Sequence, residues 1–228
     1  MSSIVLSPGA TGAAAFTIEA PSTATSRVIT LPDATDTLVG KATTDTLTNK
    51  TLVAPALGTP ASGNLANCTG AITSGTAQAS TSGTSIDFTG IPSGVKRVTV
   101  MFNGVSTNGT SDLQIRLGDA GGVENSGYLG AGVFVAGSTA ATAYTAGFGV
   151  RNQNGAACVL LGSIILTLEN ASTFSWTAQG IFAGSDGAYI QLTSGSKSTS
   201  AQTDRVRITT VNGTDTFDAG EINILYES

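Results

Sequence analysis

Two stretches of the 228-residue chain place a serine three residues before a lysine, a spacing used where a lysine amine activates a serine nucleophile. They are Ser93-Gly-Val-Lys96 and Ser194-Gly-Ser-Lys197. That chemistry needs a helical turn to bring the amine onto the hydroxyl, and it is accompanied by Ser-Asp-Asn and Lys-Thr-Gly motifs that this chain lacks. The first stretch runs into a predicted strand and the second lies in a Gly/Ser-rich segment. We therefore interpret both matches as chance.

Carboxylate pairs are the second candidate chemistry, because glycoside hydrolases use two Asp or Glu residues across the scissile bond. Asp also favours turns and strand ends through hydrogen bonds to its own backbone. We therefore interpret the candidate carboxylates as turn and strand-end residues. Their loops also do not match the ligand pattern of an EF-hand calcium loop. The candidates are Asp112, Asp119 and Glu124 in one group, and Asp215, Asp218 and Glu221 in another.

Histidine is absent from the chain, which removes the commonest general base and the commonest metal ligand. Two cysteines, Cys68 and Cys158, are too few for a structural zinc site, which takes four nitrogen or sulfur ligands. Their contexts favour free thiols, with a bridge between them as the alternative. We expect no catalytic residue, no metal site and no cofactor, and hence a protein that is not an enzyme.

Charge and hydropathy exclude two classes of partner. Charged residues make up 11 % of the chain and the formal net charge is -5, with no basic run that could bind phosphates. We therefore expect no nucleic-acid partner. No apolar run approaches the roughly 18 residues of a membrane span, and no secretory signal is visible, so we expect no membrane insertion.

Surface binding remains as a candidate function, because exposed aromatic rings can stack on sugars or contact a protein. Tyr128 and Tyr144 lie in loop-like sequence, and Tyr189 follows an Asp-Gly turn signal. These three tyrosines are the candidate receptor contacts. The alternative is that each ring packs against the rim of the domain or against a neighbouring subunit. Trp176 alternates as a core residue does.

Composition divides the chain near residue 76. Of its thirteen aromatic residues only Phe16 comes earlier, and all six prolines lie within the first 92 residues. Such a segment cannot bury enough apolar area to offset a backbone ordering cost of roughly 1–2 kcal/mol per residue. We expect residues 1–76 to form an extended fibrous stalk that borrows its core from identical chains. Residues 77–85 read as a Ser/Gly/Thr linker, and residues 86–228 as a folded head domain.

The head sequence alternates between apolar and polar residues with a period of two, which is typical of half-buried strands. Asn103-Gly104 and Asn212-Gly213 favour tight hairpin turns, and the apolar run from Cys158 to Leu168 predicts a strand covered on both sides. The predicted fold class is all-β, an antiparallel jelly-roll-like β-sandwich. The residues predicted to face its core are Val98, Val100, Phe102, Leu113, Ile115, Leu117, Phe174, Trp176, Ala178, Ile222, Ile224 and Tyr226, while Arg205 and Arg207 face solvent.

Several phrases resemble bacteriophage tail and virion fibre sequences. Two follow each other closely, Thr44-Asp-Thr-Leu-Thr-Asn-Lys-Thr-Leu52 and Pro55-Ala-Leu-Gly-Thr-Pro-Ala-Ser-Gly-Asn-Leu-Ala-Asn-Cys-Thr-Gly70. The stretch from Phe88 to Ser106 is similar to domains at the ends of such fibres. The resemblance implies a homotrimer in the virion, anchored to tail or capsid proteins through its N-terminus. Its head would attach to a glycan or protein of the host surface.

Two other functions stay open at this point. The chain is short and has no long repetitive shaft, so a capsid head fibre or a decoration (cement) protein is an alternative to a tail fibre. A glycan depolymerase is the second alternative, because phage fibres can degrade surface polysaccharides with carboxylate pairs.

Overall fold

The computed structural model describes residue 51 and residues 72–135, 139–151, 155–156, 158–185 and 189–228. Fourteen β-strands and no helix make up the regular structure of these residues, and every strand pairing is antiparallel. The all-β class and the antiparallel sheets are therefore confirmed. Nearly all of the predicted stalk, and Cys68 with it, lies outside the described residues.

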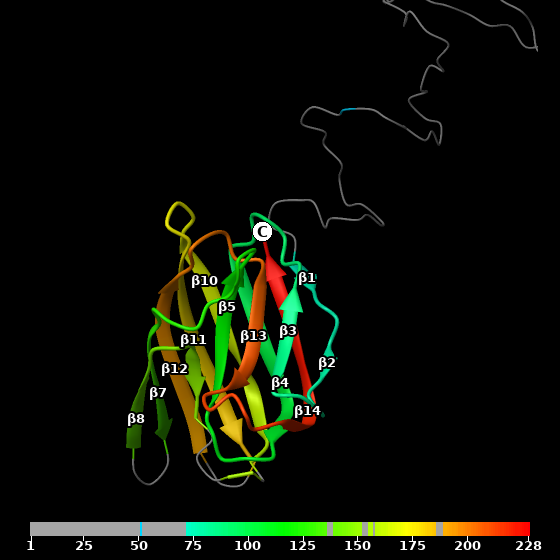
Figure 1. The fold of residues 1–228 in the computed structure, drawn as a ribbon, viewed down its shortest axis with the longest axis vertical. Coiled ribbons are helices and arrows are strands. Elements are labelled where there is room, and N and C mark those ends of the chain that lie inside the picture. Colours follow the sequence, from blue (N-terminus) through cyan, green and yellow to red (C-terminus); the bar gives the residue numbers. More distant parts are fainter. Residues whose placement is uncertain (1–50, 52–71, 136–138, 152–154, 157, 186–188) are drawn as a thin grey trace, which may run out of the picture. The chain divides into compact units, whose positions relative to one another are not determined.

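A large sheet forms one layer of the domain (Figure 1). The strands alternate in direction across it, and β2 (Gln78–Ala79) pairs with the same strand, β14, as β1 does. Its order is β1 (Ile72–Ser74), β14 (Phe217–Glu227), β4 (Arg97–Thr107), β10 (Leu160–Asn170), β11 (Ser175–Gly184), β12 (Tyr189–Ser198), β7 (Leu129–Val135) and β8 (Thr139–Tyr144).

A smaller sheet forms the second layer. β13 is an inner strand of this sheet. β9 pairs with β5, which is also an inner strand, and not with an edge strand of the sheet. The order is β3 (Ser85–Thr89), β13 (Arg205–Thr210), β5 (Leu113–Asp119) and β6 (Gly122–Val123), with β9 (Phe148–Val150) paired to β5.

The hydrophobic core lies between the two sheets and draws on both. Val98 and Val100 of the large sheet and Ile115 and Ile208 of the small sheet are all fully buried in one cluster. Full burial of each such side chain contributes about 2 kcal/mol relative to exposure. The inward residues predicted for β4, β5 and β14 are confirmed, except that Tyr226 is only partly buried.

Two predictions about single strands are wrong. Phe174 does not face the core from within a strand. It lies in the turn before β11 with a φ of 51° and is only partly buried, because the hairpin turns there in the left-handed region. The Cys158–Leu168 run is covered on one side only: Leu160 and Ile164 are buried, whereas Leu161 is 43 % exposed.

The predicted linker over residues 77–85 is also corrected. β1 and β2 both pair with β14, and Ser80 is fully buried with its hydroxyl donating to the Ala219 carbonyl at 2.8 Å. Small Ser, Gly and Thr residues suit this close approach to a neighbouring strand as well as they suit a flexible linker. The head domain therefore begins by Ile72 rather than at residue 86.

The two predicted Asn-Gly hairpin turns have different structures, although both glycines have a positive φ. Asn212-Gly213 lies in a turn between β13 and β14, with Gly213 at a φ of 71°, but it is not the predicted hairpin, because the two strands belong to different sheets. Asn103-Gly104 is not a hairpin but an irregularity inside β4, where Gly104 (φ 71°) faces Gly220 (φ 89°) of β14 and the register shifts. A positive φ serves a bulge as well as a turn.

Gly162 provides a test of this architecture. It adopts a φ of 142° at the shift in register between β10 and β4, and a Cβ there would lie 2.2 Å from the Ile181 carbonyl oxygen. We expect Gly162→Ala to destabilise the head by about 2–4 kcal/mol, because backbone strain adds to overpacking. Gly213→Ala, where nothing lies within 4 Å, should cost about 1 kcal/mol. Chemical denaturation of both variants measures the difference, and equal losses would contradict it.

Candidate interaction surface

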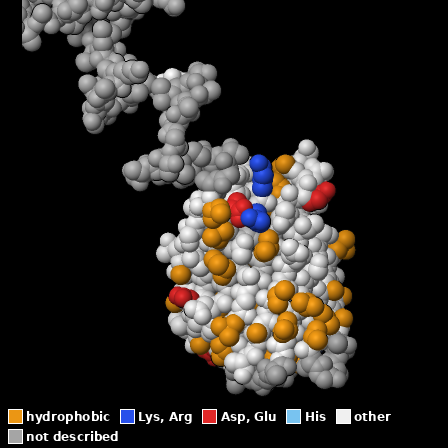
Figure 2. Space-filling view, turned by 180° about the vertical axis from the view of Figure 1, so that it is seen from behind, with side chains coloured by type: hydrophobic (Ala, Val, Ile, Leu, Met, Phe, Trp, Pro, Cys, Tyr) orange, Lys and Arg blue, Asp and Glu red, His pale blue; other side chains and the backbone are white. Residues whose placement is uncertain are grey.

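Large apolar side chains gather on the outward face of the large sheet. Val135 of β7, Leu161 of β10, Ile181 of β11, and Ile190 and Leu192 of β12 are 42 %, 43 %, 62 %, 51 % and 42 % exposed. We call these five residues the outer apolar face. Figure 2 views the molecule from behind, and hydrophobic side chains gather there over the lower part of the domain.

The strand register brings these residues together. Ile190 lies opposite Val135 on one side and Ala183 on the other, and Ala183 in turn lies opposite Leu161. In the next outward row Leu192 lies opposite Ile181. Directly opposed side chains have Cβ atoms about 4.5–5.5 Å apart, so the five residues form one continuous patch rather than scattered exposed positions.

A hollow of about 490 Å³ adjoins this patch. Ile181 and Leu192 form part of its wall, so the most exposed member of the outer apolar face borders a depression. The rest of the lining is mainly small or neutral: Ser163, Ile165, Gln179, Gly180, Thr193 and Ser194.

Charge is absent from this surface. In β7, β11, β12 and residues 161–167 of β10, no described outward position holds a charged residue. The charged side chains visible in Figure 2 lie mainly toward its upper end and margins. One marginal pair is Arg97 with Glu227, in which the guanidinium donates to the carboxylate at 2.8 Å. An uncharged, exposed apolar patch is typical of a contact surface.

β12 has its polar side chains on the inside. Gln191, Thr193 and Lys197 are buried between the sheets, while Ile190 and Leu192 face out. The Lys197 ammonium forms an ion pair with Glu124 and lies 5.4 Å from the centre of the Tyr128 ring. The Gln191 amide is 2 % exposed and has no hydrogen-bond partner within the described residues. The strand thus departs from the usual arrangement of apolar side chains inside and polar ones outside.

The three tyrosines proposed as receptor contacts are interior residues. Tyr128, Tyr144 and Tyr189 are 1 %, 5 % and 5 % exposed. The Tyr128 hydroxyl accepts a hydrogen bond from the Leu117 amide at 2.7 Å, and the Tyr144 hydroxyl donates to Asp112 at 2.6 Å. Burial raises the pKa of both phenols. Their rings offer no face to a sugar, because Tyr128 is buried just before β7, and Tyr144 and Tyr189 are buried residues of β8 and β12.

Tyr189 contacts the thiol of Cys158. Its hydroxyl lies 2.5 Å from the Cys158 sulfur, and both residues are buried, Tyr189 at the start of β12 and Cys158 just before β10. Cys158 therefore has an interior packing role. Trp176 is 3 % exposed and belongs to the core, as predicted.

The sequence motifs that could do chemistry do not assemble a reactive site. Ser194 faces out from β12 and Lys197 faces in, because residues three apart in a strand lie on opposite faces. Ser93 and Lys96 are both exposed and lie in the turn before β4 rather than on a helix. Among the described residues no group of three or more His, Cys, Asp or Glu side chains could hold a metal ion.

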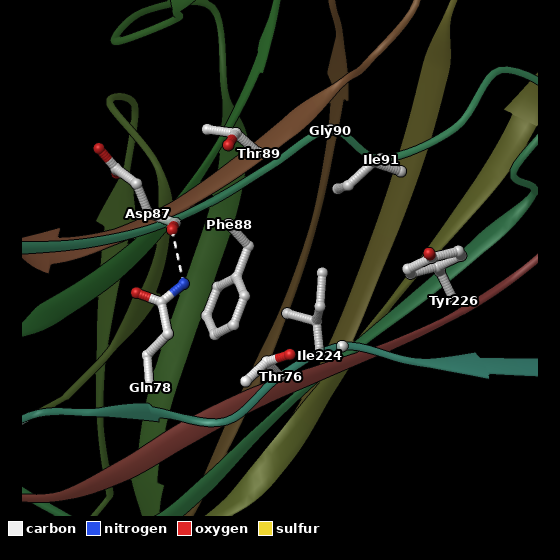
Figure 3. Close-up of a pocket in the computed structure, with 10 residues that line it drawn as sticks. Thr76, Gln78, Asp87, Phe88, Thr89, Gly90, Ile91, Ile224 and Tyr226 are labelled. Carbon is white, nitrogen blue, oxygen red and sulfur yellow. Dashed lines mark hydrogen bonds between the residues drawn. The ribbon is translucent and has the colours of Figure 1, made fainter.

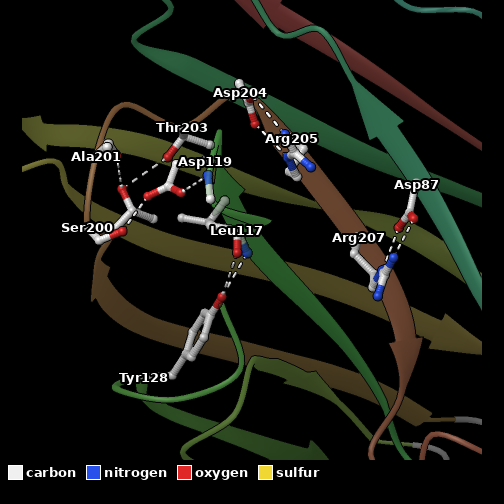
Figure 4. A network of polar contacts seen from close by, with 12 residues as sticks. Asp87, Leu117, Asp119, Tyr128, Ser200, Ala201, Thr203, Asp204, Arg205 and Arg207 are labelled. Carbon is white, nitrogen blue, oxygen red and sulfur yellow. Dashed lines mark hydrogen bonds and ion pairs between the residues drawn. The ribbon is translucent and has the colours of Figure 1, made fainter. Parts of the chain in front are cut away.

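Asp119 and Glu124 take part in a structural network around Ser200, and Figure 4 shows Asp119 beside Ser200. Asp119 accepts hydrogen bonds from the Ser200 hydroxyl at 2.5 Å and from the Gly121 amide at 2.8 Å. These bonds hold the pKa of the Asp119 carboxyl below its usual range. Glu124 accepts from the Ser200 amide at 2.6 Å in addition to pairing with Lys197. The network connects the end of β5 to the loop after β12.

A second hollow, of about 260 Å³, opens between the two sheets where β2 and β3 approach β14 (Figure 3). Phe88, Ile91 and Ile224 supply its apolar lining. The Gln78 amide crosses it to donate to the Asp87 carbonyl at 2.7 Å. This contact connects β2 with β3 across the hollow, and it adds to the pairing that holds β2 against β14.

Comparisons with protein-family models, with curated proteins and with solved structures give no significant match. Within the described part of the chain, no helix is long and apolar enough to cross a membrane.

The outer apolar face was missed by the sequence reading. β10 carries apolar residues on both of its faces, as in Leu160-Leu161 and Ile164-Ile165, a pattern that predicts a strand covered on both sides. The signal that could have located it is β12, where Ile190 and Leu192 alternate with Gln191 and Thr193. The apolar and the polar residues of that strand lie on opposite faces. One face must be buried, so either the apolar residues are exposed or the polar ones are buried.

The Lys197–Glu124 pair is open to test. The two side chains are 6 % and 21 % exposed, so Glu124→Ala leaves an almost buried ammonium without a carboxylate. We expect a loss of about 2–3 kcal/mol in the free energy of unfolding. Arg97→Ala, which removes an exposed pair, should cost less than about 1 kcal/mol. Adding Lys197→Met to Glu124→Ala should recover much of the loss in denaturant titrations, and failure to recover would show that packing rather than charge is responsible.

Acid should weaken the same network. Because the pKa of Asp119 is lowered in the folded state, its contribution to stability is present above the unfolded pKa and is lost as pH falls through the folded pKa. Asp119→Asn should therefore flatten the dependence of the unfolding midpoint on pH below about 4. Thermal unfolding between neutral pH and the acid limit measures this. An unchanged pH profile would assign the acid sensitivity to other carboxylates.

Proposed function

We propose that the protein is a non-enzymatic structural protein of a bacteriophage virion, a homotrimeric fibre whose globular head attaches to the host surface. The observation that carries the proposal is the pair of tandem N-terminal phrases, Thr44–Leu52 and Pro55–Gly70, joined to an all-β head. The uncharged outer apolar face is a structural observation that supports the proposal, because a protein that functions by assembly needs a contact surface.

The head is proposed to be a jelly roll. Its support is a nested set of antiparallel pairs: β1 and β2 with β14, β3 with β13, β4 with β10, and β5 with β9. The first strands in the sequence pair with the last one, and the strands of each further pair lie between those of the preceding pair in the sequence. A jelly roll has this pattern, because it is one long hairpin rolled into two sheets. On this reading β7, β8, β11 and β12 are additions that extend the large sheet beyond β10.

The N-terminal residues are proposed to form an intertwined stalk and an anchor to tail or capsid proteins. Their sequence has too few large apolar residues to fold alone, and identical chains around one axis could bury its thin apolar stripes together. The head would contact a host glycan or protein through surfaces other than the three buried tyrosines.

The native mass of the purified full-length chain is the first test. We expect three times the 22.7 kDa of one chain, measured by light scattering after size exclusion or by native mass spectrometry. A trimer would justify labelling the virion, which separates a tail fibre from a capsid head fibre or decoration protein by position. A monomer at every concentration would contradict the fibre.

A glycan depolymerase remains the second alternative. Incubation of intact trimer with host polysaccharide should release no reducing ends if the proposal is right. Release of reducing ends that is abolished by replacing the Asp215, Asp218 and Glu221 group would favour the enzyme instead.

A further inference from the structure

The outer apolar face has an energetic inconsistency when the head is considered alone. β12 presents Ile190 and Leu192 to water while it buries Gln191 and Lys197 between the sheets. Reversing that strand's two faces would suit an isolated domain better, since exposed apolar area and a buried unpaired amide are both unfavourable. The arrangement becomes favourable once something removes the outward side chains from water.

We propose that the outer apolar face is the surface through which the heads of identical chains contact one another; the proposal rests on the homotrimeric fibre proposed above. Around a threefold axis each copy meets two others through different parts of its surface. The face offers both parts, because Ile181 projects from the sheet beside the hollow that it borders. A projecting side chain of one copy can therefore enter the hollow of the next.

Charge is the argument for a second copy over a different partner. No described outward position of β7, β11 or β12 carries a charged residue, so two such faces meet without burying an unpaired charge. An acidic glycan or a charged protein would find no counter-charge there. A neutral glycan would find no aromatic ring, because the aromatic residues of these strands, Phe134, Trp176, Phe182 and Tyr189, alternate onto the inward side.

The area sets how strong the contact can be. Four strands about 4.8 Å apart, each with about seven residues at about 3.3 Å, make a face of roughly 450 Å². A stable interface removes about 800 Å² per partner. The face alone is therefore a weak contact, and tight association needs a further contribution such as the stalk. Head contact and stalk would act together through their covalent connection.

The test uses the full-length chain with Ile181→Asp and Leu192→Asp combined, and Val211→Asp as the matched control. Val211 is 48 % exposed and lies in the turn after β13, away from the face. Because all three side chains are exposed in the single chain, each variant should keep the fold, which circular dichroism checks. We expect the double variant to raise the trimer's dissociation concentration by about 100-fold, tenfold for each carboxylate, and Val211→Asp to leave it unchanged.

Hydroxyl-radical footprinting of the wild-type chain provides a readout that does not depend on any variant folding. Ile181 and Leu192 should react several-fold more slowly in the trimer than after dilution to monomer, whereas Val211 should react equally in both. A wild-type trimer with fully reactive Ile181 and Leu192, or one that the double variant does not weaken, would overturn the proposed interface and leave the fibre standing. A wild-type chain that stays monomeric would overturn both.

Discussion

The two-residue alternation of strand geometry is the constraint on which the head depends. A strand has two faces, and in this domain only one of them can reach the core between the sheets. β4, β5 and β13 meet the constraint simply, because Val98, Val100, Ile115 and Ile208 all point inward and are fully buried. β12 has the opposite arrangement: Ile190 and Leu192 point outward, while Gln191 and Lys197 point inward and are buried. Neighbouring residues provide partners for the buried lysine. The Lys197–Glu124 pair and the bonds to Ser200 are the local response to a lysine that alternation places inside.

Much of the fold follows from the sequence for the same reason. Alternating residues such as Leu113, Ile115 and Leu117 locate strands and their inner face without knowledge of the partners. Pairing order is different, since it depends on contacts between residues far apart in the chain. β1 and β2 are separated from their partner β14 by about two thirds of the chain. No local pattern in a Ser/Gly/Thr-rich stretch predicts this pairing.

The candidate site was harder to predict than the fold. A loop-like composition around Tyr128 and Tyr144 suggested exposure, but each hydroxyl finds a partner inside the domain and its ring packs there. The outward position of Ile181 depends on which side of β11 the small sheet covers, and that is a property of the layers rather than of the strand. A glycine has a similar ambiguity: Gly104 and Gly213 share a φ of 71°, yet one lies inside a strand and the other in a turn.

The position of β14 has a consequence for biosynthesis. This strand comes last in chain order, yet it lies inside the large sheet and pairs with β1, β2 and β4. While the ribosome is still adding residues 217–227, the early strands have no partner along that edge and the core is open on one side. The head can close only after β14 has left the exit tunnel, by which time the strands that precede it in the sequence have emerged. Any joining of neighbouring chains through completed heads must therefore wait until β14 has been synthesised.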